Sequence, residues 1–292
     1  MSYPHVATSG RVVVTGTSGR LGPAVVKHLA QHGWDVVAAD VAAPTQPLPA
    51  KVVKVDLTDF GQVVELLTGF DECPPVTAVV HLAAIPAPGL RPDAVTFANN
   101  MTAAYNVYRA ARIAGIRNVV SASSETTLGL PFDVPPPYVP IDEDYAVIPQ
   151  TTYSLGKALE EDMARHLVRW DPTLKFISLR FSNVMLPEDY AGFEAWQDDA
   201  KLRRWNLWSY IDARDGAQAV RKALELDATG WDAFIIANAD NAMRRDSADL
   251  VAKEFPNVPV KRPIVGRETL LSIDKARRVL GYNPEFAWQD QL

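Results

Sequence analysis

The stretch Arg11-Val-Val-Val-Thr-Gly-Thr-Ser-Gly-Arg-Leu-Gly22 decides the fold, because it joins a strand-forming run to a glycine-rich turn. The three valines at positions 12–14 are β-branched and apolar, which suits a strand buried on both faces. Glycines follow at 16, 19 and 22, and a helical pattern then opens with Pro23, whose missing N–H costs nothing in a first helical turn. Together, a strand, a glycine-rich turn and a helix predict backbone N–H groups that can bind a pyrophosphate.

An acidic residue ends the next strand-like segment, at Asp40, eighteen positions after Gly22. Dinucleotide sites keep a ribose-binding acid at about this spacing. A carboxylate there accepts hydrogen bonds from both ribose hydroxyls and repels a 2′-phosphate, so we expect NAD rather than NADP. Arg20, a cation near the turn, would offset part of that repulsion, and an ordinary polar strand end is the alternative interpretation of Asp40.

The composition is that of an ordinary globular protein of 292 residues, with 48% hydrophobic and 22% charged residues. A formal net charge of −6 argues against nucleic acid as the main partner. Cys73 is the one cysteine, so an intrachain disulfide is impossible and a reducing compartment is expected. Residues 1–10 have no apolar core and are expected to form a loose leader. We find no apolar run that approaches a membrane span, and therefore expect a cytoplasmic protein.

Strand-like and helix-like segments alternate along the first 180 residues. This order predicts an α/β protein with a Rossmann-type, doubly wound parallel sheet, whose ligand lies at the carboxyl ends of the strands. Small Ala83 and Ala84, after one such strand, would let a cofactor approach the backbone. The expected strands cover residues 36–40, 51–55, 77–81 and 118–122. The longest early helix is expected over residues 93–114.

A second chemical element follows a proline-rich loop, at Tyr153-Ser-Leu-Gly-Lys157. Tyr153 and Lys157 are four positions apart and share one face of a predicted helix. A lysine ammonium beside a phenol stabilises the phenolate, so we expect a lowered Tyr153 pKa and a role as general acid or base. Ser124, at the end of a neighbouring strand, can hydrogen-bond the same substrate oxygen.

These segments together resemble the extended short-chain dehydrogenase/reductase family, whose members are often grouped as NAD-dependent epimerases and dehydratases. The resemblance is carried by TGTSGRLG (15–22), Asp40, HLAA (81–84), the pair Asn99-Asn100, SASSETTLG (121–129), YSLGK (153–157) and RFSNV (180–184), and by YIDARDGAQAV and SIDKARRVLGYNP near the C-terminus. It implies a catalytic set of Ser124, Tyr153 and Lys157. It also implies cofactor contacts from Gly16, Ser18, Gly19, Arg20, Leu21, Asp40, Asp56, Leu57, Leu82, Ala83, Ala84, Asn99, Tyr153, Lys157, Phe181 and Ser182.

The C-terminal third departs from the nucleotide-sugar members of that family. Those enzymes usually carry a longer insertion after the sixth strand and an arginine just before the segment equivalent to 210–212, where this chain has Leu207, Trp208 and Ser209. Arg203 and Arg204 stand nearby and could substitute. The stretch 185–212 is more similar to the uronate dehydrogenase branch. Its aromatic residues would either stack on a sugar ring or form the hydrophobic lid of a lobe: Tyr190, Trp196, Trp205 and Trp208.

The resemblance therefore predicts an NAD-binding domain over 11–183 and a small C-terminal, mainly substrate-binding lobe over 184–292, with 211–240 returning to the first domain. The expected substrate contacts are Glu125, Thr126, Asn183 and Trp208, no metal is expected, and a homodimer is favoured. The main hypothesis is an NAD-dependent dehydrogenase acting on a small carbohydrate-like substrate. The alternatives are a nucleotide-sugar epimerase or dehydratase that retains NAD, for which Glu125 is a candidate acid–base group, and a non-catalytic NAD-binding protein.

Overall fold

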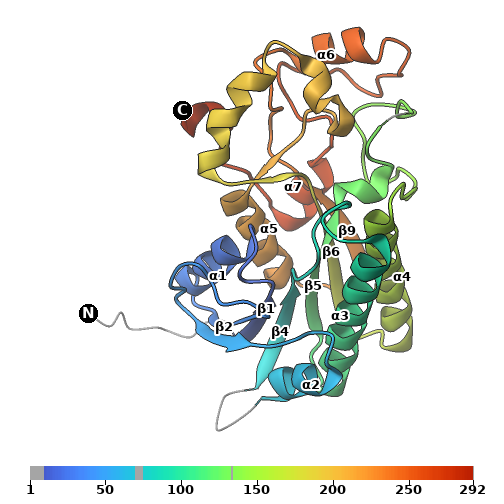
Figure 1. Ribbon diagram of the computed structural model, residues 1–292. Coiled ribbons are helices and arrows are strands. Elements are labelled where there is room, and N and C mark those ends of the chain that lie inside the picture. The colour runs from blue at the N-terminus through green and yellow to red at the C-terminus, as the bar shows by residue number, and fades with distance from the viewer. Residues whose placement is uncertain (1–9, 70–74, 133, 292) are drawn as a thin grey trace.

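The computed structural model describes residues 10–69, 75–132 and 134–291. The leader expected at 1–10 lies outside these residues except for Gly10, and so does Cys73. Figure 1 shows a sheet flanked by helices, with a smaller lobe stacked on one end of it.

The central sheet has seven strands, all parallel, in the order β3-β2-β1-β4-β5-β6-β9. This arrangement confirms the predicted Rossmann-type, doubly wound fold. The chain winds outward from β1 to β3 on one side and from β4 on the other, so a crevice opens between β1 and β4. The strands are β1 (Arg11–Thr15), β2 (Asp35–Asp40), β3 (Lys51–Lys54), β4 (Val76–His81), β5 (Asn118–Ser124), β6 (Lys175–Phe181) and β9 (Gly230–Ile236).

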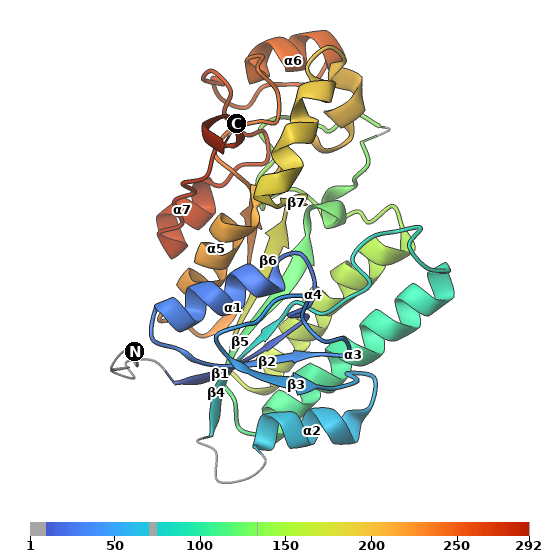
Figure 2. The same ribbon diagram turned by 60° about the vertical axis from the view of Figure 1, so that its left-hand side comes forward.

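The valines of β1 show why both faces of the sheet must be covered. Val12 and Val14 belong to the core shared with α1 and α5, whereas Val13 belongs to the core shared with α2, α3 and α4. Side chains alternate between the faces of a strand, so consecutive valines require helices on both sides. Figure 2 shows α1 and α5 on one side of the sheet and α2 and α3 on the other. The bounds are α1 (Gly22–Gln31), α2 (Phe60–Thr68), α3 (Asp93–Ile113), α4 (Thr152–Trp170) and α5 (Ala213–Glu225).

The helix ends follow local chemistry. Asp59 caps α2 by accepting a hydrogen bond from the Gln62 amide, and Thr151 and Ser154 form a reciprocal capping box at the start of α4. Past the end of α3, Gly115 takes a positive φ of 74° that favours glycine. Within the described ranges, no helix is long and apolar enough to cross a membrane.

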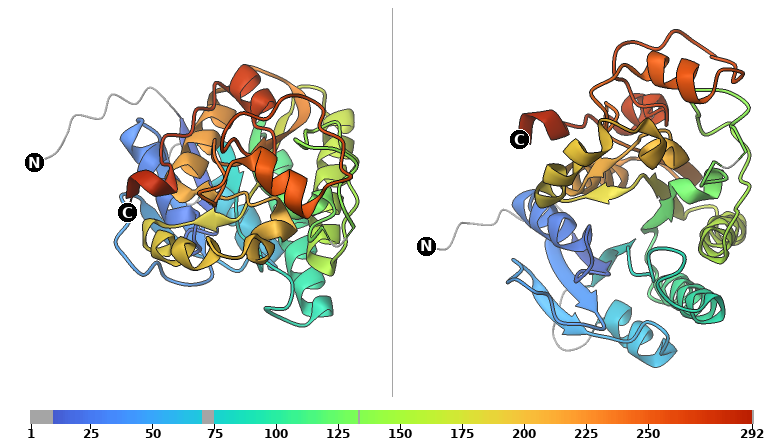
Figure 3. Two further views of the ribbon diagram at one scale, coloured as in Figure 1. Left: turned by 90° about the horizontal axis from the view of Figure 1, so that it is seen from above. Right: turned by 45° about the horizontal axis from the view of Figure 1, so that its top comes forward.

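The lobe is built from short elements after β6. Strands β7 (Val184–Met185) and β8 (Ile211–Asp212) pair in parallel, and 3-10 helices η2 (Pro187–Trp196) and η3 (Ala200–Asn206) lie between them. The lobe is completed by α6 (Ser247–Glu254) and η4 (Trp288–Gln291), while α7 (Asp274–Leu280) packs near β9. Seen from above in Figure 3, these segments cover one end of the sheet. A small aromatic core holds part of the lobe together: Tyr190, Phe193, Tyr210 and Trp288.

We predict that Gly22→Ala destabilises the protein, because a Cβ at Gly22 would lie 2.3 Å from the Gly16 carbonyl oxygen and 2.5 Å from Thr17 Cα. The turn would have to move, at a cost of about 1–3 kcal/mol in the free energy of unfolding. Gly192→Ala is the matched control, since a Cβ there meets no atom within 4 Å. Chemical denaturation of the two variants measures the difference, and equal stability would contradict the prediction.

Candidate active site

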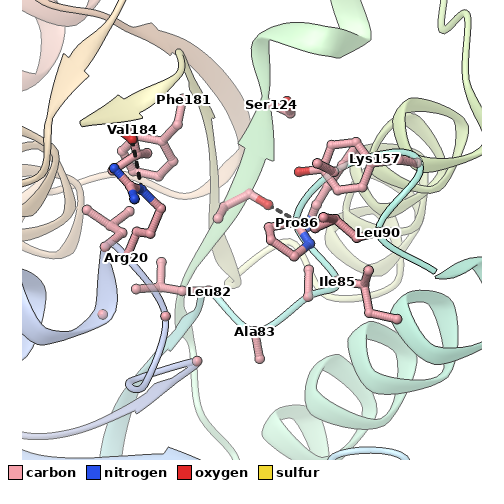
Figure 4. A pocket seen from close by; sticks show the side chains of 18 of the residues that line it. Arg20, Leu82, Ala83, Ile85, Pro86, Leu90, Ser124, Lys157, Phe181 and Val184 are labelled. Atoms are coloured by element: carbon pink, nitrogen blue, oxygen red, sulfur yellow. Dashed lines mark hydrogen bonds between the residues drawn. The ribbon is translucent and has the colours of Figure 1, made fainter. Parts of the chain in front are cut away.

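A cavity of about 1150 Å³ lies at the carboxyl ends of the central strands. All but one of the residues predicted for cofactor, catalysis and substrate line it, so the fold brings together segments that are far apart in the sequence. In Figure 4, Arg20, Phe181 and Val184 lie on one side, Ser124 and Lys157 on the other, and the loop after β4 runs between them. The predicted residues that line the cavity are Gly16, Ser18, Gly19, Arg20, Leu21, Asp40, Asp56, Leu57, Leu82, Ala83, Ala84, Asn99, Ser124, Glu125, Thr126, Tyr153, Lys157, Phe181, Ser182 and Asn183.

The turn between β1 and α1 packs directly on the segment after β4. Gly16 has a φ of 75°, and a Cβ on it would lie 2.6 Å from the Ala83 backbone nitrogen. Only glycine combines this conformation with so close an approach. The turn is therefore fixed against the floor of the cavity.

Asp40 connects the end of β2 to the same turn. Its Oδ2 accepts a hydrogen bond of 2.8 Å from the Ser18 amide, and its Oδ1 accepts one of 3.1 Å from the Ala42 amide. The carboxylate is thus oriented by backbone donors and lines the cavity. A negative charge held in this way favours ligands with hydroxyl donors and disfavours an additional phosphate.

In the Asn99-Asn100 pair of α3, Asn99 lines the cavity and Asn100 binds the loop after β4. Asn100 is buried, with its Oδ1 accepting from the Ile85 amide at 2.8 Å and its Nδ2 donating to the Ile85 carbonyl at 3.0 Å. Asn99 donates to Asn100 Oδ1 at 3.1 Å and lines the cavity. Asparagine is unfavourable in the interior of a helix. Here the Asn100 side chain satisfies the N–H and the C=O of Ile85, which lies in the loop after β4.

The three expected catalytic side chains come from the end of β5 and the first two turns of α4. Strand β5 continues two residues beyond its predicted end and so carries Ser124, whose Oγ accepts hydrogen bonds from the Thr126 amide and hydroxyl. Tyr153 and Lys157 are both buried on the cavity-facing side of α4. The Lys157 ammonium donates to the Ala122 carbonyl and to Glu160 Oε2, at 2.9 Å each.

The expected lowering of the Tyr153 pKa is wrong for this structure. Burial raises the pKa of the phenol above its ordinary value, while Lys157 and the Ser124 hydroxyl act to lower it less strongly. The lowering was expected for an unpaired Lys157, but the charge of Lys157 is paired with Glu160, which raises the Tyr153 pKa. In the ligand-free protein, therefore, the Tyr153 phenol is harder to ionise than an ordinary tyrosine.

Glu125 introduces a second ionisable group beside Ser124. Burial raises its pKa to about 7, although hydrogen bonds from Ser182 (2.6 Å) and Asn206 (3.1 Å) and the charge of Arg203 act to lower it. Glu125 lines the cavity, but its oxygens are turned toward these partners. It can therefore exchange a proton near neutral pH.

Trp208 does not fit its predicted place at the substrate. It is fully buried, with its indole Nε1 donating to the Ala200 carbonyl and its ring packed on Phe255. Leu207 and Trp208 both have positive φ, which turns the chain and carries the indole into the core. Trp205, three residues earlier, lines the cavity instead.

Of the other aromatic candidates, Tyr190 is buried and Trp196 is partly buried, and both belong to the lobe's packing. These two residues and Trp208 are therefore packed within the protein and do not line the cavity.

Neither Arg203 nor Arg204 replaces the arginine that the sequence lacks before residue 210. Arg203 is buried, with its guanidinium donating to Asn183 Oδ1 and to the Ser209 carbonyl. Arg204 faces Glu254 at 3.5 Å. Among the described residues that line the cavity, the cations are Arg20 and Lys157.

The apolar part of the cavity lining, from the loop after β4 and from Trp205, was not predicted. Pro86 and Pro88 are typical of a loop but do not indicate where it folds. A contact between the glycine turn and the lobe was not predicted either: Arg20 donates to the Val184 carbonyl at 3.2 Å and pairs with Asp189 of η2. In the described part of the chain, no cluster of three or more His, Cys, Asp or Glu side chains could hold a metal ion.

Comparison with known proteins finds a matching family and solved structures of similar fold. The sequence profile of the NAD dependent epimerase/dehydratase family matches residues 12–237. A curated relative, UDP-glucose 4-epimerase 2 of Oryza sativa subsp. japonica, is 28% identical over 201 residues, which cover 62% of this chain and 47% of that protein. The chain thus spans about half the length of the first curated relatives that it matches.

Two solved structures illustrate the likeness of fold. A UDP-galactose 4-epimerase superposes with a TM-score of 0.69 and 27% identity, over 96% of this chain and 95% of that one. A mutated uronate dehydrogenase superposes with a TM-score of 0.68 and 21% identity, over 96% and 83% of the two chains. At the lower identity the likeness shows the fold alone.

We predict that Glu125→Gln stabilises the protein at alkaline pH. The folded-state pKa of Glu125 lies above its ordinary value of 4.5, so the stability linked to its proton is present below about pH 4.5 and is lost as the pH rises through about 7. Above pH 7 the buried charge destabilises the wild type, whereas glutamine stays neutral. The advantage of the variant should approach, at most, about 3 kcal/mol.

Thermal melting of wild type and Glu125→Gln at pH 5, 7 and 8.5 measures this difference. Glu194→Gln, which alters an exposed glutamate paired with Arg244, should track the wild type throughout. A gap between Glu125→Gln and wild type that stays constant with pH would refute the assignment.

Proposed function

Because the chain belongs to the NAD dependent epimerase/dehydratase family, we propose that it is an NAD-dependent dehydrogenase that oxidises a hydroxyl of a small sugar or sugar acid. One observation carries the proposal: Ser124, Tyr153 and Lys157 line the same cavity as the glycine turn and Asp40. A dinucleotide held by the turn at one end would extend toward these three side chains at the other. The extended short-chain dehydrogenase/reductase family performs hydride chemistry with such a set.

The cavity residues fit the two halves of NAD. Amides of the turn 16–21 would bind the pyrophosphate, which Gly16 allows to approach the backbone closely. Asp40, already oriented by two amides, would accept hydrogen bonds from the adenosine ribose. Asp56 and Leu57 would border the adenine, and the residues assigned to the nicotinamide half are Leu82, Ala83, Ala84, Asn99, Phe181 and Ser182.

Bound NAD supplies an acceptor for the hydride that leaves the substrate carbon. The chain's part is to remove the hydroxyl proton and to hold the oxygen. Tyr153, as phenolate, would take that proton, and Ser124 would donate a hydrogen bond to the same oxygen. Lys157 would stabilise the phenolate and bind the ribose next to the nicotinamide. Since burial raises the Tyr153 pKa, oxidation should become faster as the pH rises.

The substrate end of the cavity supports a small reactant. Glu125, Thr126, Asn183 and Trp205 line it, and an indole such as that of Trp205 is a side chain that can pack on a sugar. The described lobe residues contribute no cation to the lining, because Arg203 and Arg204 are engaged elsewhere. A nucleotide diphosphate would therefore meet little opposite charge there.

A nucleotide-sugar epimerase that retains NAD is the second candidate function. The relative with 28% identity and the solved structure with 27% identity are both 4-epimerases of UDP-sugars, and this observation favours it. Such an enzyme would return the hydride to the sugar and would show no net reduction of NAD. The two candidates thus differ in a directly measurable product.

We also propose a homodimer in which α3 and α4 pack against their counterparts in a second copy. Apolar side chains on both helices support this, since Val95, Tyr105, Leu155 and Trp170 are each between 43% and 57% exposed.

The division into an NAD-binding domain (11–183, with 211–240) and a substrate lobe is likewise proposed. A cytoplasmic location is proposed from the single cysteine in the sequence.

We predict that the purified protein reduces added NAD, followed at 340 nm, with at least one member of a panel of free sugars, aldonates and uronates. Tyr153→Phe should lower this turnover by roughly 10²–10⁴ while leaving NAD affinity intact, because only the transferable proton is lost. Tyr145→Phe makes the same change at a partly buried tyrosine that does not line the cavity, and its turnover should match that of the wild type.

The same assay is run with UDP-sugars in place of the free sugars and sugar acids. Interconversion of a UDP-sugar without accumulation of NADH would favour the epimerase. Wild-type turnover in Tyr153→Phe would remove the proposed mechanism for either enzyme.

A further inference from the structure

Lys157 is one half of a buried ion pair within α4. Its ammonium is 2.9 Å from Glu160 Oε2, one turn further along the helix, and the two side chains are 3% and 4% exposed. The Ala122 carbonyl of β5 accepts a second hydrogen bond from the same ammonium. The lysine is thereby held between its own helix and the strand that carries Ser124.

The neighbouring Glu161 has a different and complete set of partners. Its two oxygens bind the Arg180 guanidinium at 2.9 and 2.7 Å, and Oε1 also accepts from the Ser123 hydroxyl at 2.6 Å. Glu161 therefore ties α4 to β5 and β6. The carboxylate of Glu160, in contrast, is directed at Lys157.

A buried ion pair contributes little to stability, because removing both charges from water offsets most of their attraction. The location of this pair gives it another consequence. Lys157 acts to lower the Tyr153 pKa, and Glu160 acts to raise it. The carboxylate therefore opposes the effect that a free lysine would have on the phenol.

We propose that Glu160 is a positioning residue for the reaction proposed above: its carboxylate holds the Lys157 ammonium against β5 and offsets part of the positive charge that Tyr153 experiences. The proposal rests on the proposed function only for its consequence in catalysis. The pairing itself is a property of the ligand-free chain.

Two effects on protonation follow. Burial acts to lower the pKa of Lys157, but Glu160, Tyr153 and Glu161 together raise it above its ordinary value, so the lysine stays charged through the neutral range. Removing the carboxylate lowers the proton affinity of every group around it, Lys157 and Tyr153 alike.

The other ionisable groups around the pair are accounted for by their own neighbours. From β4, His81 is kept neutral, since burial and Lys157 lower its pKa to about 3. From α3, burial raises the pKa of Tyr108 well above its ordinary value. The charge of Glu161 is paired with that of Arg180, and Glu125 accepts hydrogen bonds from Ser182 and Asn206. None of these replaces the carboxylate of Glu160.

The test is to titrate Lys157 directly, with neither NAD nor substrate present. NMR of protein labelled with [13Cε]-lysine follows the side chain from about pH 7 to about pH 12, and Lys157→Met assigns its signal. In the wild type the signal should remain that of an ammonium up to about pH 10. In Glu160→Gln the midpoint should fall by at least about one pH unit. Asp162→Asn removes an exposed carboxylate from the same helix, three residues before its partner Arg165, and should leave Lys157 unchanged.

Glu160→Asp keeps the charge but withdraws it by one methylene group, so it should give a smaller fall in the same direction. It decides the question if the glutamine variant does not fold. An unchanged or higher midpoint in whichever of the two variants folds would overturn the proposal.

The consequence in catalysis is read from the pH profile of kcat/KM. Its acidic limb should move to lower pH by about one unit in Glu160→Gln, with the Asp162→Asn profile as reference. A protein that shows the Lys157 shift but no NAD reduction would refute the dehydrogenase and leave the pairing intact. A shifted lysine with an unmoved acidic limb would overturn the assignment of Glu160 to the reaction.

Discussion

The close contact between the glycine turn and the segment after β4 is the constraint on which the cavity depends. Gly16 leaves no room for a side chain against Ala83, so the turn lies directly on the segment after β4, beyond the paired ends of β1 and β4. Asp40 then fixes the outer side of the turn through the Ser18 amide, and Arg20 connects it to the lobe. This one turn thus contacts the segment after β4, the end of β2 and the lobe.

The opposite end of the cavity is organised by buried charge rather than by backbone contact. Lys157 and Glu160 form an ion pair within α4, and Glu161 and Arg180 form a second pair that joins α4 to β6. Glu125, which lines the same cavity, has a pKa of about 7. Such groups cost free energy to bury, and perturbed ionisable groups gather where proton transfer occurs. The site therefore combines a half organised by the glycine turn with a half that contains buried ionisable groups.

Much of the fold and the cavity could be predicted because short-range rules determine them. Valine runs, the glycine turn and the capping residues specify strands and helices locally, and a parallel sheet then brings all strand ends to one edge. Trp208 and the Tyr153 pKa could not be predicted in this way. The first depends on positive-φ residues that bury the indole, and the second on the balance of burial against Lys157 and Glu160. Both are set by packing across distant segments, which periodicity does not report.

We have proposed that the turn and Asp40 form a site for NAD. Calorimetric titration of the purified protein with NAD and with NADP is the decisive measurement. We expect reversible binding of one NAD per chain, at least about tenfold tighter than NADP, which corresponds to about 1.4 kcal/mol. The preference should narrow in Asp40→Ala, because the ribose hydroxyls lose their acceptor and the 2′-phosphate loses its repulsion. Binding of NADP as tight as that of NAD, or tighter, would show that Asp40 does not select NAD.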